Sequence, residues 1–111
     1  MQHMSVESQT ESGEVIERFN GETGFDGSLV YRFPEQEGCC IRFIDWYGHT
    51  VFNHLQLPIL IAEFEKLKSS LPEDLHGHLN DLIAFIARAH ARSETNDGGT
   101  YIRFIGKMTV E

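Results

Sequence analysis

The chain has 111 residues and a mass of 12.7 kDa, enough for one domain with one hydrophobic core. Hydrophobic residues make up 41% and charged residues 23% of the sequence, a balance typical of globular rather than disordered or fibrous proteins. Nine basic residues face 17 acidic ones, and the net charge of −8 argues against the clustered basic surface that nucleic-acid binding requires.

The N-terminal residues are polar. Residues 4–13 (MSVESQTESG) contain one small apolar side chain besides the methionine, so burial would not offset the entropy lost on ordering them. We therefore expect a flexible N-terminal arm at residues 1–13 and a single α+β domain at residues 14–111. The start MQHM resembles the residues that cloning sites leave, and residues 1–3 are interpreted as an expression scar.

Four β-rich runs follow the arm. Residues 14–19 and 28–33 flank a loop rich in Gly, Asn and Asp (NGETGFDG), which predicts a hairpin that ends at Pro34. Residues 39–46 and 49–53 flank Gly48 and predict a second hairpin. Four successive strands favour an antiparallel meander.

Two amphipathic helices come next. Apolar residues recur at intervals of three and four from Leu57 to Leu71, and Pro58 suits the first turn of a helix. A second set from Leu75 to Ala89 predicts a helix of roughly 20 residues. The apolar positions are Leu57, Leu60, Ile61, Phe64, Leu67, Leu71, Leu75, Leu79, Leu82, Ile83, Ile86 and Ala89.

After a turn segment at residues 93–99, the β pattern returns in TYIRFIGKMTV. A lone strand after two helices buries its apolar face only by joining the sheet that already exists. The sequence therefore predicts an α+β fold with an antiparallel sheet of about five strands (β-β-β-β-α-α-β) and two helices packed on one face.

The letters IRFI occur twice, at residues 41–44 and 102–105, without similarity on either side. We interpret the repeated tetrapeptide as two strands with the same packing requirement rather than as a duplication. Phe43 and Phe104 are then expected to face the helices. Arg42 and Arg103 are expected on the opposite face of the sheet.

Arg32 also interrupts an apolar strand, and the three arginines Arg32, Arg42 and Arg103 could gather on one face. Two interpretations remain open. Each arginine could pair across the sheet with a carboxylate such as Glu17, which contributes little stability at an exposed site. Alternatively, the three could form a cationic spot that docks a carboxylate or phosphate.

Other candidate partner-binding residues are aromatic or acidic. Trp46 and Tyr47 fall at a predicted hairpin tip, where exposed aromatic side chains often anchor interfaces, although Trp46 could instead fold back onto the core. Glu35 and Glu37 belong to an acidic N-terminal third, in which residues 1–40 hold eight acids and two bases. That acidity suits either solubility or a basic protein partner.

Catalytic and metal-binding patterns are absent from the sequence. His76 and His78 are two residues apart, which places them on different sides of a helix. Cys39 and Cys40 are adjacent, so they make no stapling disulfide and have no evident histidine partner; a dimer disulfide through the outward cysteine stays open. We expect no enzyme activity, no metal and no cofactor, and we expect a cytoplasmic protein without a membrane partner.

The segment RFIDWYGHTVFN, together with RFIG near the end of the chain, resembles a pattern found in small uncharacterised bacterial proteins. The resemblance covers about residues 40–67 and 100–106; it implies a bacterial source and no activity. In size and acidity the chain resembles, as a class, bacterial immunity proteins that neutralise a basic toxin. We therefore expect a non-catalytic protein-binding module, with a small-ligand-binding or structural or accessory domain as the alternative and a homo-oligomer left open.

Overall fold

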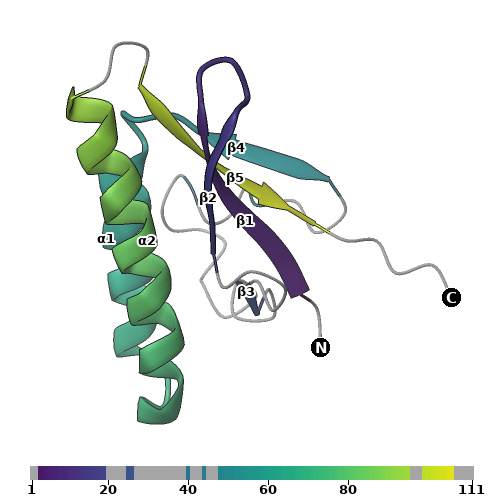
Figure 1. The fold of residues 1–111 in the computed structure, drawn as a ribbon. Coiled ribbons are helices and arrows are strands. Elements are labelled where there is room, and N and C mark those ends of the chain that lie inside the picture. Colours follow the sequence, from purple (N-terminus) through teal and green to yellow (C-terminus); the bar gives the residue numbers. More distant parts are fainter. Residues whose placement is uncertain are drawn as a thin grey trace, which may run out of the picture.

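The computed structural model describes residues 3–19, 25, 26, 40, 44, 48–95 and 99–106. Four strands precede the helices: β1 (His3–Thr10), β2 (Val15–Arg18), β3 (Phe25–Asp26) and β4 (His49–Phe52). The helices are α1 (Leu57–Ser69) and α2 (His76–Thr95), with a 3₁₀ turn at Glu73–Leu75 between them, and β5 (Thr100–Ile105) follows. The expected α+β class and the order of elements are thus confirmed (Figure 1).

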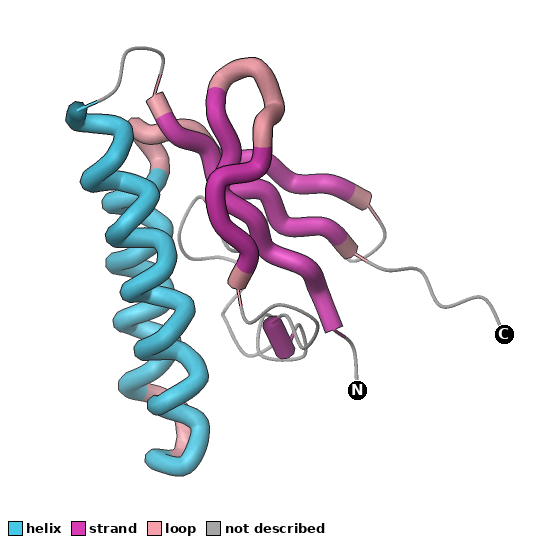
Figure 2. Tube along the Cα trace, in the orientation of Figure 1, coloured by secondary structure: helices cyan, strands magenta, loops and turns pink. Residues whose placement is uncertain are grey.

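The described strands pair in the order β2-β1-β5-β4, and the two-residue β3 pairs with the start of β1. All of these pairings are antiparallel. Both helices lie together on one side of the sheet (Figure 2). The closing strand β5 therefore joins the sheet as predicted, but it does so between β1 and β4 rather than at an edge.

The expectation of a flexible arm is wrong for residues 3–10, which form the inner strand β1. This strand pairs with β2 on one side and with β5 on the other. Met4 and Val6 are each 1% exposed, and Val6 lies opposite Phe104 of β5 in the core. His3, one of the residues interpreted as an expression scar, is the first residue of this strand. The two inner-strand pairings and the burial of Met4 and Val6 supply the stabilisation that composition alone did not indicate.

The strand β2 forms a hairpin with β1, a segment that the sequence had indicated as a flexible arm. The turn between them closes with two hydrogen bonds, from the Thr10 N–H to Glu14 O and from the Gly13 N–H to Thr10 O, both 2.9 Å long. Gly13 has a φ of 92°, a conformation that most other residues adopt only with strain. The predicted partner strand at residues 28–33 lies outside the described residues, as does most of the run at 39–46.

Both helices agree with the apolar spacing in the sequence. Pro58 lies in the first turn of α1, where the missing N–H leaves no hydrogen bond unmade. Asn53 stabilises the turn that precedes α1, because its side-chain oxygen accepts hydrogen bonds from the N–H groups of Leu55 and Gln56. Within the described part of the chain, no helix is long and apolar enough to cross a membrane.

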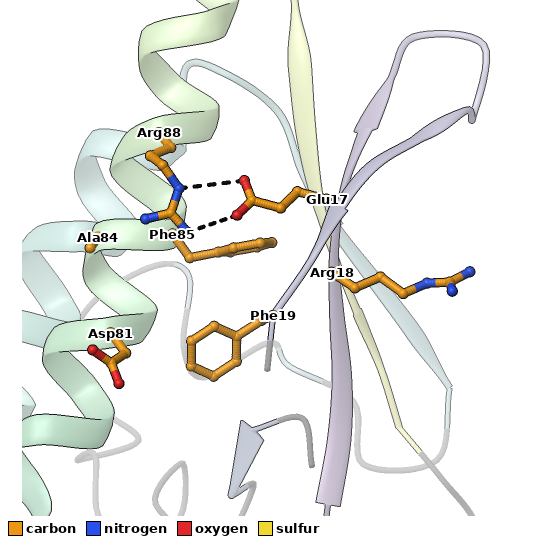
Figure 3. A pocket seen from close by; sticks show the side chains of 7 residues that line it. All are labelled: Glu17, Arg18, Phe19, Asp81, Ala84, Phe85 and Arg88. Carbon is orange, nitrogen blue, oxygen red and sulfur yellow. Dashed lines mark hydrogen bonds and ion pairs between the residues drawn. The ribbon is translucent and has the colours of Figure 1, made fainter. Parts of the chain in front are cut away.

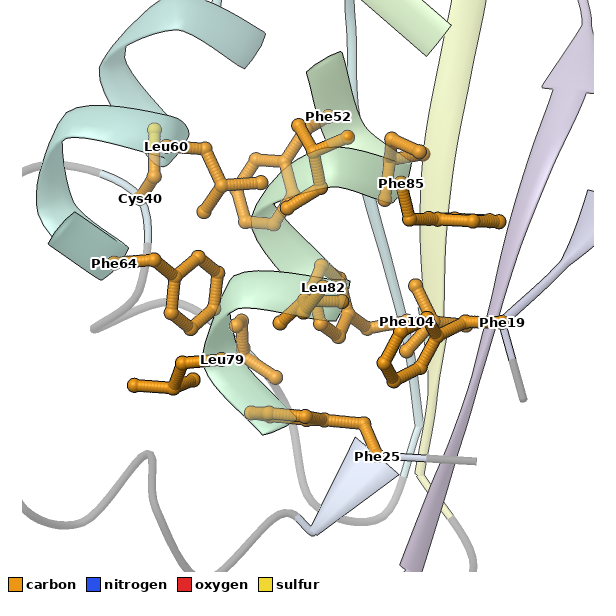
Figure 4. Close-up of a cluster of buried hydrophobic side chains, with 14 of the residues drawn as sticks. Phe19, Phe25, Cys40, Phe52, Leu60, Phe64, Leu79, Leu82, Phe85 and Phe104 are labelled. Atoms are coloured by element: carbon orange, nitrogen blue, oxygen red, sulfur yellow. The ribbon is translucent and has the colours of Figure 1, made fainter. Parts of the chain in front are cut away.

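The core lies between the helices and the sheet, and phenylalanine rings dominate it (Figure 4). Phe104 of β5 contacts three other rings, those of Phe25, Phe52 and Phe64, at centroid distances of 6.1, 5.9 and 6.3 Å. The prediction that Phe104 faces the helices is confirmed; Phe43 lies outside the described residues. The core joins β1, β3, β4 and β5 to both helices, and Phe19, which directly follows β2, extends it to the place where the hairpin approaches α2.

Candidate functional site

The helix α2 carries a row of chemically diverse side chains toward the β1–β2 hairpin. Asp81, Phe85, Arg88 and Arg92 are spaced four, three and four residues apart, which places them along one face of the helix. The acidic residue Asp81 lies at the N-terminal end of this row, and the basic residues Arg88 and Arg92 lie at the C-terminal end. The residue that meets the basic end is Glu17 of β2.

Glu17 lies on the helix-facing side of β2 and binds both arginines. Its Oε2 accepts a hydrogen bond of 2.8 Å from Arg88 Nη2, and its Oε1 lies 3.2 Å from Arg92 Nη2. The hydrogen bonds from Arg88, together with the positive charges of Arg88 and Arg92, hold the pKa of Glu17 below its usual value although burial opposes them. Glu17 therefore stays ionised and clamps the hairpin to the helix.

Two aromatic rings form a wall below this clamp. Phe19 follows β2 and packs edge-on against Phe85 of α2, with ring centroids 5.6 Å apart. His78, about two turns before Phe85 on α2, lies 5.7 Å from Phe19 and stacks on Phe25. The guanidinium of Arg88 lies 5.7 Å from the centroid of the Phe85 ring. A cation is thus already accommodated against the Phe85 ring.

A hollow of about 320 Å³ opens between β2 and α2 at this place (Figure 3). The residues that line it are Glu17, Arg18, Phe19, Asp81, Ala84, Phe85 and Arg88. In the close-up, Glu17 extends toward Arg88, whereas Arg18 extends from the other side of the strand, away from the helix. The small, exposed side chain of Ala84 leaves the space between the clamp and Asp81 open.

Asp81 is the lining residue whose charge stays uncompensated. Glu17 neutralises Arg88, and Arg18 binds Glu7 with a distance of 3.0 Å between Arg18 Nε and Glu7 Oε2. Asp81 is exposed, and among the described residues its carboxylate has no hydrogen-bond or ion-pair partner. The hollow therefore presents one free carboxylate beside an aromatic wall.

The opposite face of the sheet holds a second polar group, centred on Glu7. The Glu7 carboxylate accepts hydrogen bonds from Arg18 and from Gln9 Nε2, and both Glu7 and Gln9 are buried. A smaller hollow of about 240 Å³ lies beside them. Its lining residues are Ser5, Val6, Glu7, Arg18, Phe19 and Ile105. Arg18 and Phe19 thus separate two hollows, one on each side of β2.

Arg103 lies on β5 with its side chain on the face opposite Phe104, as predicted. Its cross-strand neighbours are Glu7 and Val51, so the suggested pairing with Glu17 is wrong because Glu17 lies on the helix-facing side. The Arg103 Nε is buried and has no hydrogen-bond partner in the described part of the molecule. Arg32 and Arg42, the other two members of the predicted cationic spot, lie outside the described residues.

Cys40 is fully buried, so it is not the outward cysteine that a dimer disulfide would need. Its backbone N–H lies 3.3 Å from both carboxylate oxygens of Glu63, a buried residue of α1. Glu63 thereby anchors the chain at Cys40 to the helix, which is a structural role for a buried acid.

The other predicted partner-binding residues lie outside the described ranges. They are Arg32, Glu35, Glu37, Arg42, Trp46 and Tyr47. The sequence did not single out the clamp residue Arg92. It also did not single out six residues that line the hollow: Arg18, Phe19, Asp81, Ala84, Phe85 and Arg88. The spacing of Asp81, Phe85 and Arg88 on one helix face was the available signal, but nothing in the sequence indicated that Glu17 would meet this face.

Comparison of the chain with protein-family models, with curated proteins and with solved structures found no match. In the residues that the structure covers, no group of three or more His, Cys, Asp or Glu side chains could hold one metal ion. The functional argument therefore depends on the charge and shape of the described surface.

Proposed function

We propose that this chain is a small, non-catalytic protein-binding module whose partner carries a basic surface. The partner class that we place first is a basic toxin domain, which an acidic immunity protein would neutralise. The observation that carries the proposal is the carboxylate of Asp81, which has no partner among the described residues, in a chain with a net charge of −8.

The distribution of ion pairs supports a basic partner. Four described bases are engaged within the molecule: Arg18 with Glu7, Arg88 and Arg92 with Glu17, and Lys68 with Glu65. Because acids outnumber bases by 17 to nine, internal pairing leaves an excess of carboxylates. Such a surface raises the association rate with a basic protein and repels acidic ones.

The state of Glu17 supports a binding role rather than catalysis. A general acid or base at neutral pH requires a carboxyl group whose pKa is raised toward 7. The pKa of Glu17 is instead lowered, by the hydrogen bonds and charges of two arginines. The one described carboxyl group with a shifted pKa therefore suits an ion pair, and its partners hold two elements together.

A small-ligand-binding domain is the second candidate, and the hollow of about 320 Å³ is the observation that favours it. Ligand pockets start at roughly this size, about 300 Å³. They are usually lined by apolar groups, however, whereas four of the seven described residues that line this hollow are charged. This lining favours contact with a charged side chain of a protein.

Affinity capture from cells of the source organism tests the proposal. We expect the tagged chain to retain a protein with a basic surface in low salt, encoded beside its own gene, and to release it as the salt concentration rises. Calorimetry with the purified pair should then give a one-to-one complex. If no basic protein binds, and a small molecule or metal ion raises the melting temperature in a thermal-shift screen, the proposal is wrong and the second candidate replaces it.

A further inference from the structure

We propose that the face of the sheet opposite the helices binds a carboxylate at Arg103, and that this carboxylate is the C-terminal one of a partner chain. The inference does not depend on the proposed function, because it concerns an anionic group and a different face of the molecule. Both helices lie on the other side of the sheet (Figure 2). Each step depends on how the residues around Arg103 use their charges.

Arg103 is the exception among the four described arginines. The other three each bind the carboxylate of Glu7 or Glu17. The side chain of Arg103 is half-buried on β5 and has no ion-pair or hydrogen-bond partner among the described residues. A partly desolvated cation without an acceptor is unusual in a chain that has 17 acids and nine bases. A carboxylate from another molecule would supply the missing acceptor.

The neighbouring acid does not fill this role. Glu7 lies directly opposite Arg103 in the pairing of β1 with β5. Its Oε1 accepts a hydrogen bond from Gln9 Nε2 and its Oε2 accepts one from Arg18 Nε, each 3.0 Å long. Arg18 thus neutralises Glu7, and the row formed by Arg18, Glu7 and Arg103 carries one uncompensated positive charge.

The accessible part of the guanidinium is the end that carries Nη1 and Nη2. Among the nitrogens of Arg103, only Nε is buried without a partner. A carboxylate that approaches from solvent therefore meets the two Nη groups, and this end of a planar guanidinium donates two parallel hydrogen bonds to it. A cation finds no open acceptor here, because both oxygens of Glu7 are engaged. This row thus selects an anion although the whole chain is acidic.

Apolar side chains flank the Arg103 guanidinium. Val51 of β4 lies directly opposite Arg103 and is 47% exposed. Tyr101 and Ile105, two residues before and after Arg103 on the same face, are half-buried. A C-terminal valine, leucine or isoleucine carries a branched apolar group next to its carboxylate and would contact both the cation and these flanks. An acidic side chain has no such branch, so the flanks favour a C-terminus.

Three probes test the site by titration into the ¹⁵N-labelled full chain while amide chemical shifts are followed. They are N-acetyl-valine, its neutral isostere N-acetyl-valine amide, and N-acetyl-glutamate α-methylamide, whose carboxylate is on a side chain. We expect N-acetyl-valine to shift the amides of Glu7, Val51 and residues 101–105 in a saturable way with millimolar affinity. The neutral amide should bind at least about fivefold more weakly, because it carries no charge for Arg103. The glutamate probe should bind at least about twofold more weakly, because it lacks the apolar branch.

Variants identify the cation. Arg103→Gln should weaken binding of N-acetyl-valine at least about fivefold, because it removes the guanidinium. Its melting temperature should fall by less than about 2 °C, because Arg103 has no partner to lose. Lys68→Gln is the matched control: it removes a base that Glu65 pairs on α1, on the other side of the sheet, and should change the affinity at most about twofold.

Two results would overturn the carboxylate site: equal binding of N-acetyl-valine and its amide, or an unchanged affinity in Arg103→Gln. Tighter binding of the glutamate probe than of N-acetyl-valine would overturn the assignment to a C-terminus and make an acidic side chain the ligand. None of these results bears on the capture of a basic protein, so the two proposals fail separately.

Discussion

The carboxylate of Glu17 connects two elements that are far apart in the sequence. It lies in β2, and its two partners lie one turn apart near the C-terminal end of α2. Its side chain is 30% exposed, so water and salt reduce the strength of both ion pairs. Two pairs that share one carboxylate nevertheless fix the distance between hairpin and helix, and that distance defines the hollow.

Glu17→Gln should lower the free energy of unfolding at pH 7 by about 1–2 kcal/mol, because the amide retains some hydrogen bonding but loses its charge. The effect depends on pH. Because the pKa of Glu17 is lower in the folded state than in the unfolded state, its stabilisation is complete above the unfolded pKa of about 4.3. It is lost as the pH falls through the folded pKa. Urea denaturation at pH 7 and at pH 3 measures both values.

Glu11→Gln provides the control for this prediction. Glu11 is exposed in the β1–β2 turn, and among the described residues its side chain has no hydrogen-bond or ion-pair partner. We expect it to change stability by less than about 0.5 kcal/mol at either pH. A difference between wild type and Glu17→Gln that stays the same from pH 7 to pH 3 would contradict the clamp.

At the scale of elements, β1 is a strand that the sequence pattern did not predict. Met4 and Val6 face the core, but the next helix-facing residue is Ser8, which is fully buried with its hydroxyl 3.5 Å from Glu17 O. On the other face, Glu7 and Gln9 are buried because they bind each other and Arg18. After Val6 the strand is polar on both faces, so it lacks the sustained apolar alternation on which prediction depends.

The helices, in contrast, were predictable because their apolar residues recur at regular spacing. Leu60, Phe64 and Leu67 of α1 are all buried, at the three-four spacing that marks one helix face. The candidate site depends on pairing between distant segments, and no local pattern encodes the contact between Glu17 and Arg88. The sequence thus indicates periodic apolar elements, whereas polar inner strands and long-range ion pairs require the structure.

If β1 is an inner strand, Met4→Ala should lower the free energy of unfolding by about 2–5 kcal/mol, because it opens a cavity where the side chain is 1% exposed. Leu55→Ala, at a position 71% exposed, serves as the control and should cost less than about 0.5 kcal/mol. Chemical denaturation measures both. A chain that begins at Glu11 should fail to unfold cooperatively; a melting temperature equal to that of the full chain would show that β1 is dispensable.

At the scale of the whole molecule, the net charge of −8 acts on a compact body with a radius of gyration of 13.4 Å. Like charges repel one another across this distance, which destabilises the folded state more than the expanded one. The described ion pairs work in the opposite direction, but their side chains are partly exposed and each contributes little. We therefore expect repulsion to dominate the response to salt.

The last prediction follows from this balance. Raising NaCl from 10 to 200 mM shortens the Debye length from about 30 to about 7 Å, which screens long-range repulsion more than contacts near 3 Å. The melting temperature should therefore rise, by about 2–4 °C for each 0.5 kcal/mol regained. Glu17→Gln should show a larger rise, because it has lost attractive pairs that salt weakens. A fall in melting temperature with salt would show instead that local ion pairs, with the Glu17 clamp foremost, outweigh the excess of negative charge.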